Sequence, residues 1–236
     1  MPKKPPEKMT CKKCFAELFC TSLHTQDNDA LNALLHQTKA SQVFQENEYL
    51  FHSHDSFLNF YMVKQGAFKK FLLTADGREQ IGAFFLPGEL IGLDSVGYQA
   101  YQFSVVAIQH DSIACEIPAE KLLPFIQQNT DMQSRLLKIT SEQFHHIDFI
   151  SRNAHAKEKI AAFLLNISER YHACNKQNTD QIRLPMSRQD IGNYLGLTIE
   201  TVSRIFTELK KDLILEIQGK EVIISDIQKL SKTAGF

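Results

Sequence analysis

Three cysteines lie within ten residues near the start of the chain, in the sequence CKKCFAELFC that begins at Cys11. The three are Cys11, Cys14 and Cys20. The whole chain contains only two more cysteines, Cys115 and Cys174. Thiols this close together can form a disulfide, bind zinc, act as a redox thiol pair or ligate iron. The spacing alone leaves these four chemistries open.

Other residues that could support chemistry form no complete site. His52 and His54 have the HxH spacing of a cupin metal site, but Leu58 and Asn59 stand where that site needs a glutamate. No GxSxG, HExxH or phosphate-loop motif occurs in the chain. The sequence therefore predicts a protein that is not an enzyme.

Composition narrows the class of protein further. The chain has 236 residues, of which 43% are hydrophobic, and a formal net charge of −1. This charge argues against a general polyanion binder but leaves room for a local DNA-reading face. No run approaches the ~18 apolar residues of a membrane span, and the basic N-terminus lacks the apolar region of a secretory signal. We expect a cytoplasmic protein, in which disulfides are rare.

The pattern along the chain changes several times. Residues 1–26 form the cysteine-rich N-terminal segment, and a helix is expected from about residue 27 to 40. Short strand-like runs punctuated by glycines follow, so that residues 27–118 are expected to form a sensor domain built around an antiparallel, jelly-roll-like β-roll. The fold class is therefore α+β.

A long helical segment, residues 119–153, separates this domain from residues 154–236. Its apolar side chains recur at helical spacing. A lone helix with such a stripe needs a partner, and we expect it to pair with a second copy of the chain. The predicted dimerisation residues are Leu136, Ile139, Phe144 and Ile147.

The C-terminal segment is typical of a winged helix–turn–helix. Ser187 and Asp190 have the spacing of a capping box that opens a short helix, Gly196 provides the turn, and Thr198 caps a second helix. The following sequence LILEIQGKEVIIS predicts a hairpin, which would be the wing.

The second of these helices has two separate faces. One is apolar, whereas the other presents short polar side chains and an arginine, as a major-groove reader requires. An ordinary helical hairpin with a solvated polar face is the alternative, and the hairpin that follows favours DNA binding. The candidate DNA-binding residues are Glu200, Ser203, Arg204, Thr198, Thr201, Ser187 and Arg188.

The order β-roll, long helix, winged helix–turn–helix resembles the CRP/FNR family of bacterial transcription regulators over nearly the whole chain. The cyclic-nucleotide branch of that family needs an arginine soon after the PGE turn, to pair with the cyclic phosphate. The turn is present here as PGEL, starting at Pro87, but no arginine occurs between Arg78 and Arg135. Burying an unpaired phosphate would be costly, so cyclic AMP binding is disfavoured in this cyclic nucleotide-binding-like domain.

The oxygen-sensing FNR branch is the better match. Its N-terminal cysteine set resembles Cys11, Cys14 and Cys20, its fourth ligand corresponds to Cys115 in SIACEIP, and its recognition region resembles DIGNYLGLTIETVSR. This resemblance implies a [4Fe–4S] cluster held by the four cysteines, whereas Cys174 has no counterpart. A four-cysteine zinc site remains possible, but it usually needs a second CxxC pair.

The resemblance also implies a mechanism. While its cluster is intact, the protein would bind an inverted repeat of TTGAT-like half-sites as a homodimer and contact RNA polymerase through the loop from Gly92 to Gly97; oxidation would release the DNA. The alternative is a regulator of the same fold that signals through thiol redox or zinc. FNR-type dimer helices often carry an acidic residue near the position of Phe144, and its charge repulsion keeps the cluster-free chains apart. Because Phe144 is apolar, the cluster-free form of this protein is expected to dimerise more readily than a typical FNR-type protein.

Overall fold

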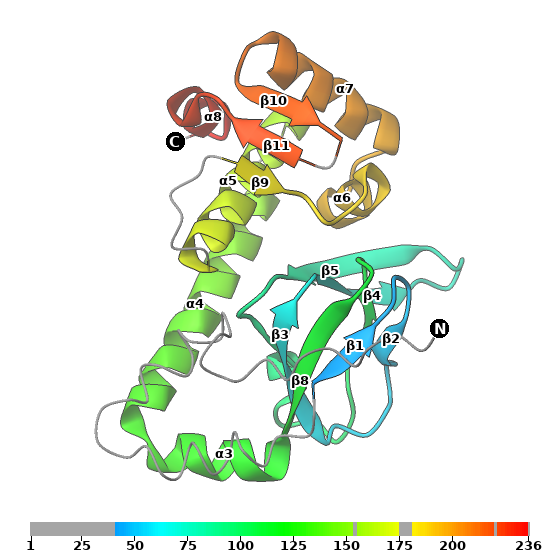
Figure 1. Ribbon diagram of the computed structural model, residues 1–236, viewed down its shortest axis with the longest axis vertical. Helices are drawn as coiled ribbons and strands as arrows, with labels where there is room; N and C mark the ends of the chain where they lie inside the picture. Colours follow the sequence, from blue (N-terminus) through cyan, green and yellow to red (C-terminus); the bar gives the residue numbers. More distant parts are fainter. Residues whose placement is uncertain (1–40, 153–154, 175–180, 220, 236) are drawn as a thin grey trace, which may run out of the picture. The chain divides into compact units, whose positions relative to one another are not determined.

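The computed structural model describes residues 41–152, 155–174, 181–219 and 221–235 (Figure 1). Three of the predicted cluster ligands and the helix expected at 27–40 lie outside these residues. The chain divides into two compact units, which we describe separately. Within the described chain, the first unit holds residues 41–68 and 85–124, and the second holds 69–84 and 125–235.

The first unit is built from antiparallel strands. One sheet has the order β1-β8-β3-β6, and β2 pairs with β7. The bounds are β1 (Gln42–Phe44), β2 (Tyr49–Phe51), β3 (Asn59–Gln65), β6 (Leu90–Ile91), β7 (Ser104–Ala107) and β8 (Ser112–Pro118), with a short 3₁₀ turn, η3 (Leu93–Ser95). The predicted antiparallel β-domain is confirmed.

Aromatic side chains form much of the core of this unit. Phe60 on β3 is fully buried, and Phe51 stacks on Tyr101 with 3.6 Å between ring centroids. The Tyr101 hydroxyl donates a 2.7 Å hydrogen bond to the carbonyl of Asn59, so its one polar group is satisfied inside an apolar cluster. The core thus holds β3 in place, and β3 in turn pairs with β8 along its length.

The second unit contains the β4–β5 hairpin and the C-terminal half of the chain. Its strands are β4 (Phe68–Leu73), β5 (Glu79–Phe85), β9 (Gln181–Arg183), β10 (Leu215–Gln218) and β11 (Glu221–Ile224). Its helices are α4 (Thr130–Arg152), α5 (Ala156–Cys174), α6 (Arg188–Leu195), α7 (Ile199–Lys211) and α8 (Ile227–Thr233), and α3 (Ala119–Gln128) precedes them. None of the helices among the described residues is apolar and long enough to cross a membrane.

The segment expected as one helix, 119–153, consists of two helices, α3 and α4. Asn129 lies between them, and its side-chain oxygen accepts a 3.1 Å hydrogen bond from the backbone N–H of Met132. This is the geometry of an N-cap, which starts a new helix with its own direction. The local sequence Asn-Thr-Asp carried that signal, but the apolar stripe running on either side of it obscured the break.

Helix α5 is buried on every side through its middle. Residues 160–168 are all buried, the polar ones included. The helix packs against α4, α7, α8 and β9, so its polar side chains Asn166 and Ser168 are enclosed as well. A helix surrounded in this way serves as the central support of the unit.

The wing is a three-stranded antiparallel sheet with the order β10-β11-β9. The hairpin predicted from the sequence is confirmed as β10–β11, with Leu215 opposite Ile224. The third strand, β9, was not predicted, because its three residues follow a polar loop. It pairs with β11 through Ile182 opposite Val222 (Figure 1).

Candidate nucleic-acid interface and cluster site

The predicted capping box at the start of α6 is confirmed. The Ser187 hydroxyl accepts a 3.0 Å hydrogen bond from the backbone N–H of Asp190, and the Asp190 carboxylate accepts a 3.1 Å bond from the N–H of Ser187. The helix ends at Gly196, whose left-handed backbone (φ 66°) makes the turn. Gly192 is required for a different reason, since a Cβ there would lie 2.6 Å from the carbonyl oxygen of Leu197.

Helix α7 follows this turn, and its apolar face is buried. Thr198 caps it by accepting a 3.3 Å hydrogen bond from the N–H of Thr201. The buried side chains recur every three or four residues, as expected for one helical face. They are Val202, Ile205, Phe206 and Leu209. Because this face anchors the helix, the opposite face is held outward on a rigid support.

The outward face of α7 carries the three central DNA-reading candidates. Glu200, Ser203 and Arg204 are all exposed. Arg204 forms a 2.7 Å ion pair with Glu208, one turn further along. Hydrogen bonds from its own backbone N–H and from the Thr198 hydroxyl lower the pKa of Glu200, so it is an ionised acceptor at neutral pH. The structure therefore presents an acceptor and a charged donor side by side.

The remaining DNA-binding candidates have different surroundings. Ser187 and Thr198 are exposed, whereas Thr201 is half-buried. The guanidinium carbon of Arg188 lies 3.5 Å from the centroid of the Phe206 ring, a stacked contact between α6 and α7. Burial lowers the pKa of Arg188 to about 10, which leaves it charged at neutral pH. Arg188 thus joins the two helices in addition to lying at the start of α6.

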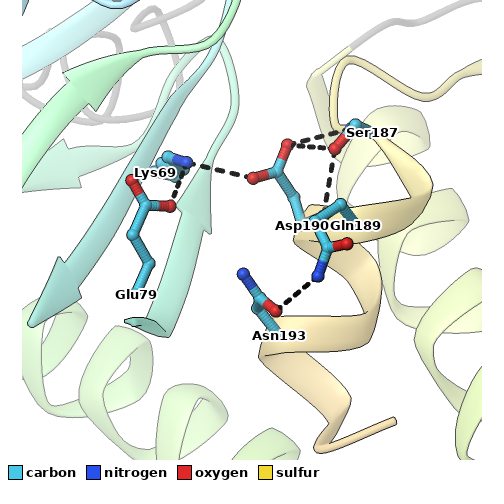
Figure 2. Close-up of polar contacts among 6 residues, drawn as sticks. All are labelled: Lys69, Glu79, Ser187, Gln189, Asp190 and Asn193. Atoms are coloured by element: carbon cyan, nitrogen blue, oxygen red, sulfur yellow. Dashed lines mark hydrogen bonds and ion pairs between the residues drawn. The ribbon is translucent and has the colours of Figure 1, made fainter. Parts of the chain in front are cut away.

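Asp190 has a second partner, which sequence reasoning missed. Its Oδ1 lies 3.0 Å from Nζ of Lys69, and Lys69 also pairs with Glu79 (Figure 2). Burial lowers the pKa of Lys69, but its hydrogen bond to Glu79 and the charge of Asp190 raise it by more. For Asp190 burial raises the pKa, and the Ser187 hydrogen bond and the Lys69 charge lower it by more. Both groups are therefore ionised at neutral pH.

Cys115 is the one predicted cluster ligand among the described residues. It is a half-buried free thiol on β8, and its Sγ lies 3.7 Å from the hydroxyl oxygen of Ser41. The buried Lys64 donates a 2.9 Å hydrogen bond to the same hydroxyl. Ser41 is the first described residue, so the segment that carries the other three cysteines joins the described chain beside Cys115.

The described residues hold no alternative metal site. No group of three or more His, Cys, Asp and Glu side chains there could hold a metal ion. His54 lies at a left-handed backbone position (φ 72°) in a turn after β2. The HxH pair therefore gains no additional ligand from the fold.

The predicted dimerisation residues of α4 differ in their exposure. Leu136 and Ile139 are half-buried, whereas Phe144 is 68% exposed, and the side chain of Ile147 lies outside the described residues. Leu137, which is not among the predicted residues, is 71% exposed. Leu137 and Phe144 are seven residues apart, the repeat of a coiled-coil seam.

A further surface follows β6. The loop from Gly92 to Gly97 forms the η3 turn, and next to it Val96 and Tyr98 are 43% and 58% exposed. Large exposed apolar side chains close together are typical of an interaction surface.

Two family models match the chain. Residues 41–129 match the model described as cyclic nucleotide-binding domain, and residues 158–233 match the Crp-like helix-turn-helix domain. The first match begins at the start of β1 and includes the β4–β5 hairpin. The second covers α6, α7 and the wing.

Characterised relatives and solved structures agree with these matches. The chain is 37% identical to the transcriptional activator protein Anr of Pseudomonas protegens and 38% identical to the transcriptional activator protein FnrA of Stutzerimonas stutzeri, in each case over 95% of this chain and 92% of the relative. It is 30% identical to the anaerobic regulatory protein of Haemophilus influenzae over 95% of this chain and 88% of that protein. The structure of FixK2 from Bradyrhizobium japonicum superposes with a TM-score of 0.72 at 29% identity, covering 83% of this chain and 96% of that one.

Proposed function

The chain belongs to the CRP/FNR family of transcription regulators, in its FNR-type branch, and on that premise we propose that it is an oxygen-responsive regulator. It binds an inverted repeat of TTGAT-like half-sites as a homodimer while a [4Fe–4S] cluster is intact and releases the DNA on oxidation. The observation that carries the DNA-binding part is the outward face of α7, where Glu200, Ser203 and Arg204 are exposed on a helix whose other face is buried.

DNA reading follows from the chemistry of that face. An arginine can donate two hydrogen bonds to O6 and N7 of guanine, and an ionised glutamate can accept from N4 of cytosine. In the free protein Arg204 is held by Glu208, so the guanidinium is already extended along the helix surface. The exposed Ser187 at the start of α6 and the backbone N–H groups of that helix end suit the DNA phosphates.

The residues around Cys115 suit a [4Fe–4S] cluster. Thiolates are the usual ligands of such a cluster, and the proposed set Cys11, Cys14, Cys20 and Cys115 supplies four. Cys115 is held on a paired strand, and Ser41, the first described residue after the segment that bears the other three, lies beside it. The ammonium group of Lys64 lies close by and offsets negative charge there. When bound, the cluster supplies an oxygen-labile iron centre.

Dimerisation is proposed through α4. Two copies of the helix would meet along a seam that contains Leu137 and Phe144, with the half-buried Leu136 and Ile139 beside it. A dimer presents two recognition helices to two half-sites about one turn of DNA, ~34 Å, apart. We propose that the exposed surface around Val96 and Tyr98 contacts RNA polymerase.

The test of this function is iron and acid-labile sulfide analysis of protein purified without oxygen, together with DNA binding before and after exposure to air. We expect about four irons and four sulfides per chain, and a loss of both cluster and DNA affinity in air. A protein that stays iron-free after anaerobic reconstitution but binds DNA would move the signal to zinc or thiol redox.

Phe144→Glu is expected to convert the cluster-loaded dimer into a monomer. Two copies of the new carboxylate would face each other across the two-fold seam and would be desolvated there. Sedimentation velocity at micromolar concentration measures the result. Phe144→Leu, which keeps the seam apolar, should remain dimeric.

The same measurement on wild-type protein without its cluster tests the departure from the family pattern. Because position 144 is apolar here, we expect partial dimerisation of this form. A clean monomer would contradict that expectation, and a dimeric Phe144→Glu would place the interface elsewhere.

A further inference from the structure

Lys69 is a buried lysine on the β4–β5 hairpin. Only 10% of its side chain is exposed, and its ammonium group pairs with Glu79 on the same hairpin and with Asp190 on α6 (Figure 2). A buried ammonium is costly unless it is paired and hydrogen-bonded, so the two carboxylates fix where Lys69 lies. The link to Asp190 joins residues that are 121 positions apart in the sequence.

The two oxygens of Asp190 have separate functions. Oδ1 faces Lys69, whereas Oδ2 accepts hydrogen bonds from the backbone N–H of Ser187 at 3.1 Å and from its hydroxyl at 2.7 Å. One carboxylate therefore connects the hairpin to the capping box that starts α6. A shift of Lys69 would move the first turn of α6 with it.

The hairpin is attached at a second place. Phe84, near the end of β5, packs against Tyr194 of α6 and Phe163 of α5, with ring centroids 5.3 and 6.2 Å away. Arg170 of α5 also donates a 2.6 Å hydrogen bond to the carbonyl of Phe84. These contacts hold the far part of α6. Its first turn is stacked on α7 through Arg188, and the ion pair at Lys69 is the contact that links this turn to the β4–β5 hairpin.

We infer that Lys69 is a positioning residue for DNA binding: through Asp190 it ties the first turn of α6 to the β4–β5 hairpin, and this tie sets where that turn meets the DNA backbone. The inference rests on the proposed function. Lys69 is itself too buried to touch DNA, so it acts through Asp190. The hairpin lies in the stretch that matches the cyclic nucleotide-binding domain. A residue of that domain therefore orients the winged helix–turn–helix, which we call the reader (β9, α6, α7, β10 and β11).

The test is a double-mutant cycle on the anaerobically purified full-length protein. Lys69→Met removes the ammonium and keeps the chain length, and Asp190→Asn removes the carboxylate charge and keeps an oxygen that can cap α6. Lys70→Met is the matched control, because it removes the same charge from the adjacent position of β4. Fluorescence anisotropy at fixed salt measures affinity for a duplex with the inverted repeat and for a scrambled duplex.

Lys69→Met and Asp190→Asn should each weaken binding to both duplexes about tenfold, because backbone contacts carry no sequence information. The double variant should bind DNA no more weakly than the single variant with the lower affinity, because both changes break the same Lys69–Asp190 ion pair. Lys70→Met should stay within about twofold of wild type. In Lys69→Met, amide hydrogens of residues 188–190 should exchange faster, while those of α7 should not.

Three outcomes overturn the inference while leaving the proposed function in place. One is unchanged DNA affinity in Lys69→Met, and another is a double variant whose loss is the sum of the two single losses. If Lys69→Met does not fold, Asp190→Asn at wild-type affinity has the same meaning. If the wild-type protein binds neither duplex, the proposed function fails together with this inference. That result is distinguishable from the other three, in which the wild-type protein binds DNA.

Discussion

Cys115→Ser is expected to reduce the iron content from about four atoms per chain to less than about one. A serine hydroxyl is far less acidic than a thiol and is a poor ligand for iron. The three cysteines of the N-terminal segment would then lack the ligand that is fixed on a paired strand. With the cluster lost, DNA affinity in the absence of oxygen should fall about tenfold or more, because the protein is then only partly dimeric.

Cys174→Ser is the matched control for this experiment. It makes the same atomic change at a cysteine outside the proposed ligand set, so iron content and DNA affinity should match those of wild type. Cys115 is only half-buried and serine has nearly its size, so the far-UV circular dichroism of Cys115→Ser should be unchanged. A Cys115→Ser protein with full iron and sulfide would remove Cys115 from the site.

Arg204→Ala is expected to weaken binding to the inverted repeat by about 1–3 kcal/mol, or roughly 5- to 150-fold, with a much smaller loss on a scrambled duplex. The side chain is exposed and its ion pair with Glu208 is on the surface, so the free energy of unfolding should change by less than about 0.5 kcal/mol. The loss therefore comes from the missing contact with a base rather than from the fold of α7.

Lys210→Ala separates base reading from general charge. It removes the same charge from an exposed position later on α7, and any loss of affinity should be similar on the two duplexes. Competition binding at one fixed salt concentration measures both variants. Equal losses on the two duplexes for Arg204→Ala would mean that Arg204 contacts the DNA backbone and that specificity resides elsewhere on α7.

The reader could be predicted from the sequence because its signals are local. Ser187 and Asp190 are three residues apart, Gly196 marks the turn, and the two faces of α7 separate within thirteen residues. Each of these features is fixed by hydrogen bonds or packing between near neighbours. The strands of the β-domain were predictable for a similar reason, since glycines at their turns punctuate short apolar runs.

Features that depend on distant contacts were not predictable. A lysine in a β-strand usually indicates a solvated position, and only folding shows that Lys69 meets Asp190. The all-round burial of α5 likewise depends on its packing against α4 and against α7, α8 and β9, which come later in the chain. The helical spacing selected Leu136 together with Ile139, and only the packing of α4 shows that the neighbouring Leu137 is the more exposed.

The pairing of β9 with β11 has a consequence for how the reader opens. One of these strands precedes α6 and the other follows α7, so both helices lie inside a loop of chain that is closed by backbone hydrogen bonds. Separating β9 from β11 releases both ends of this helix–turn–helix together. Apart from local exchange in the first turn of α6, the two helices should therefore unfold as one cooperative unit, with the amide protons of their interiors sharing a single opening free energy. A protease would then meet either an intact reader or one that is open throughout.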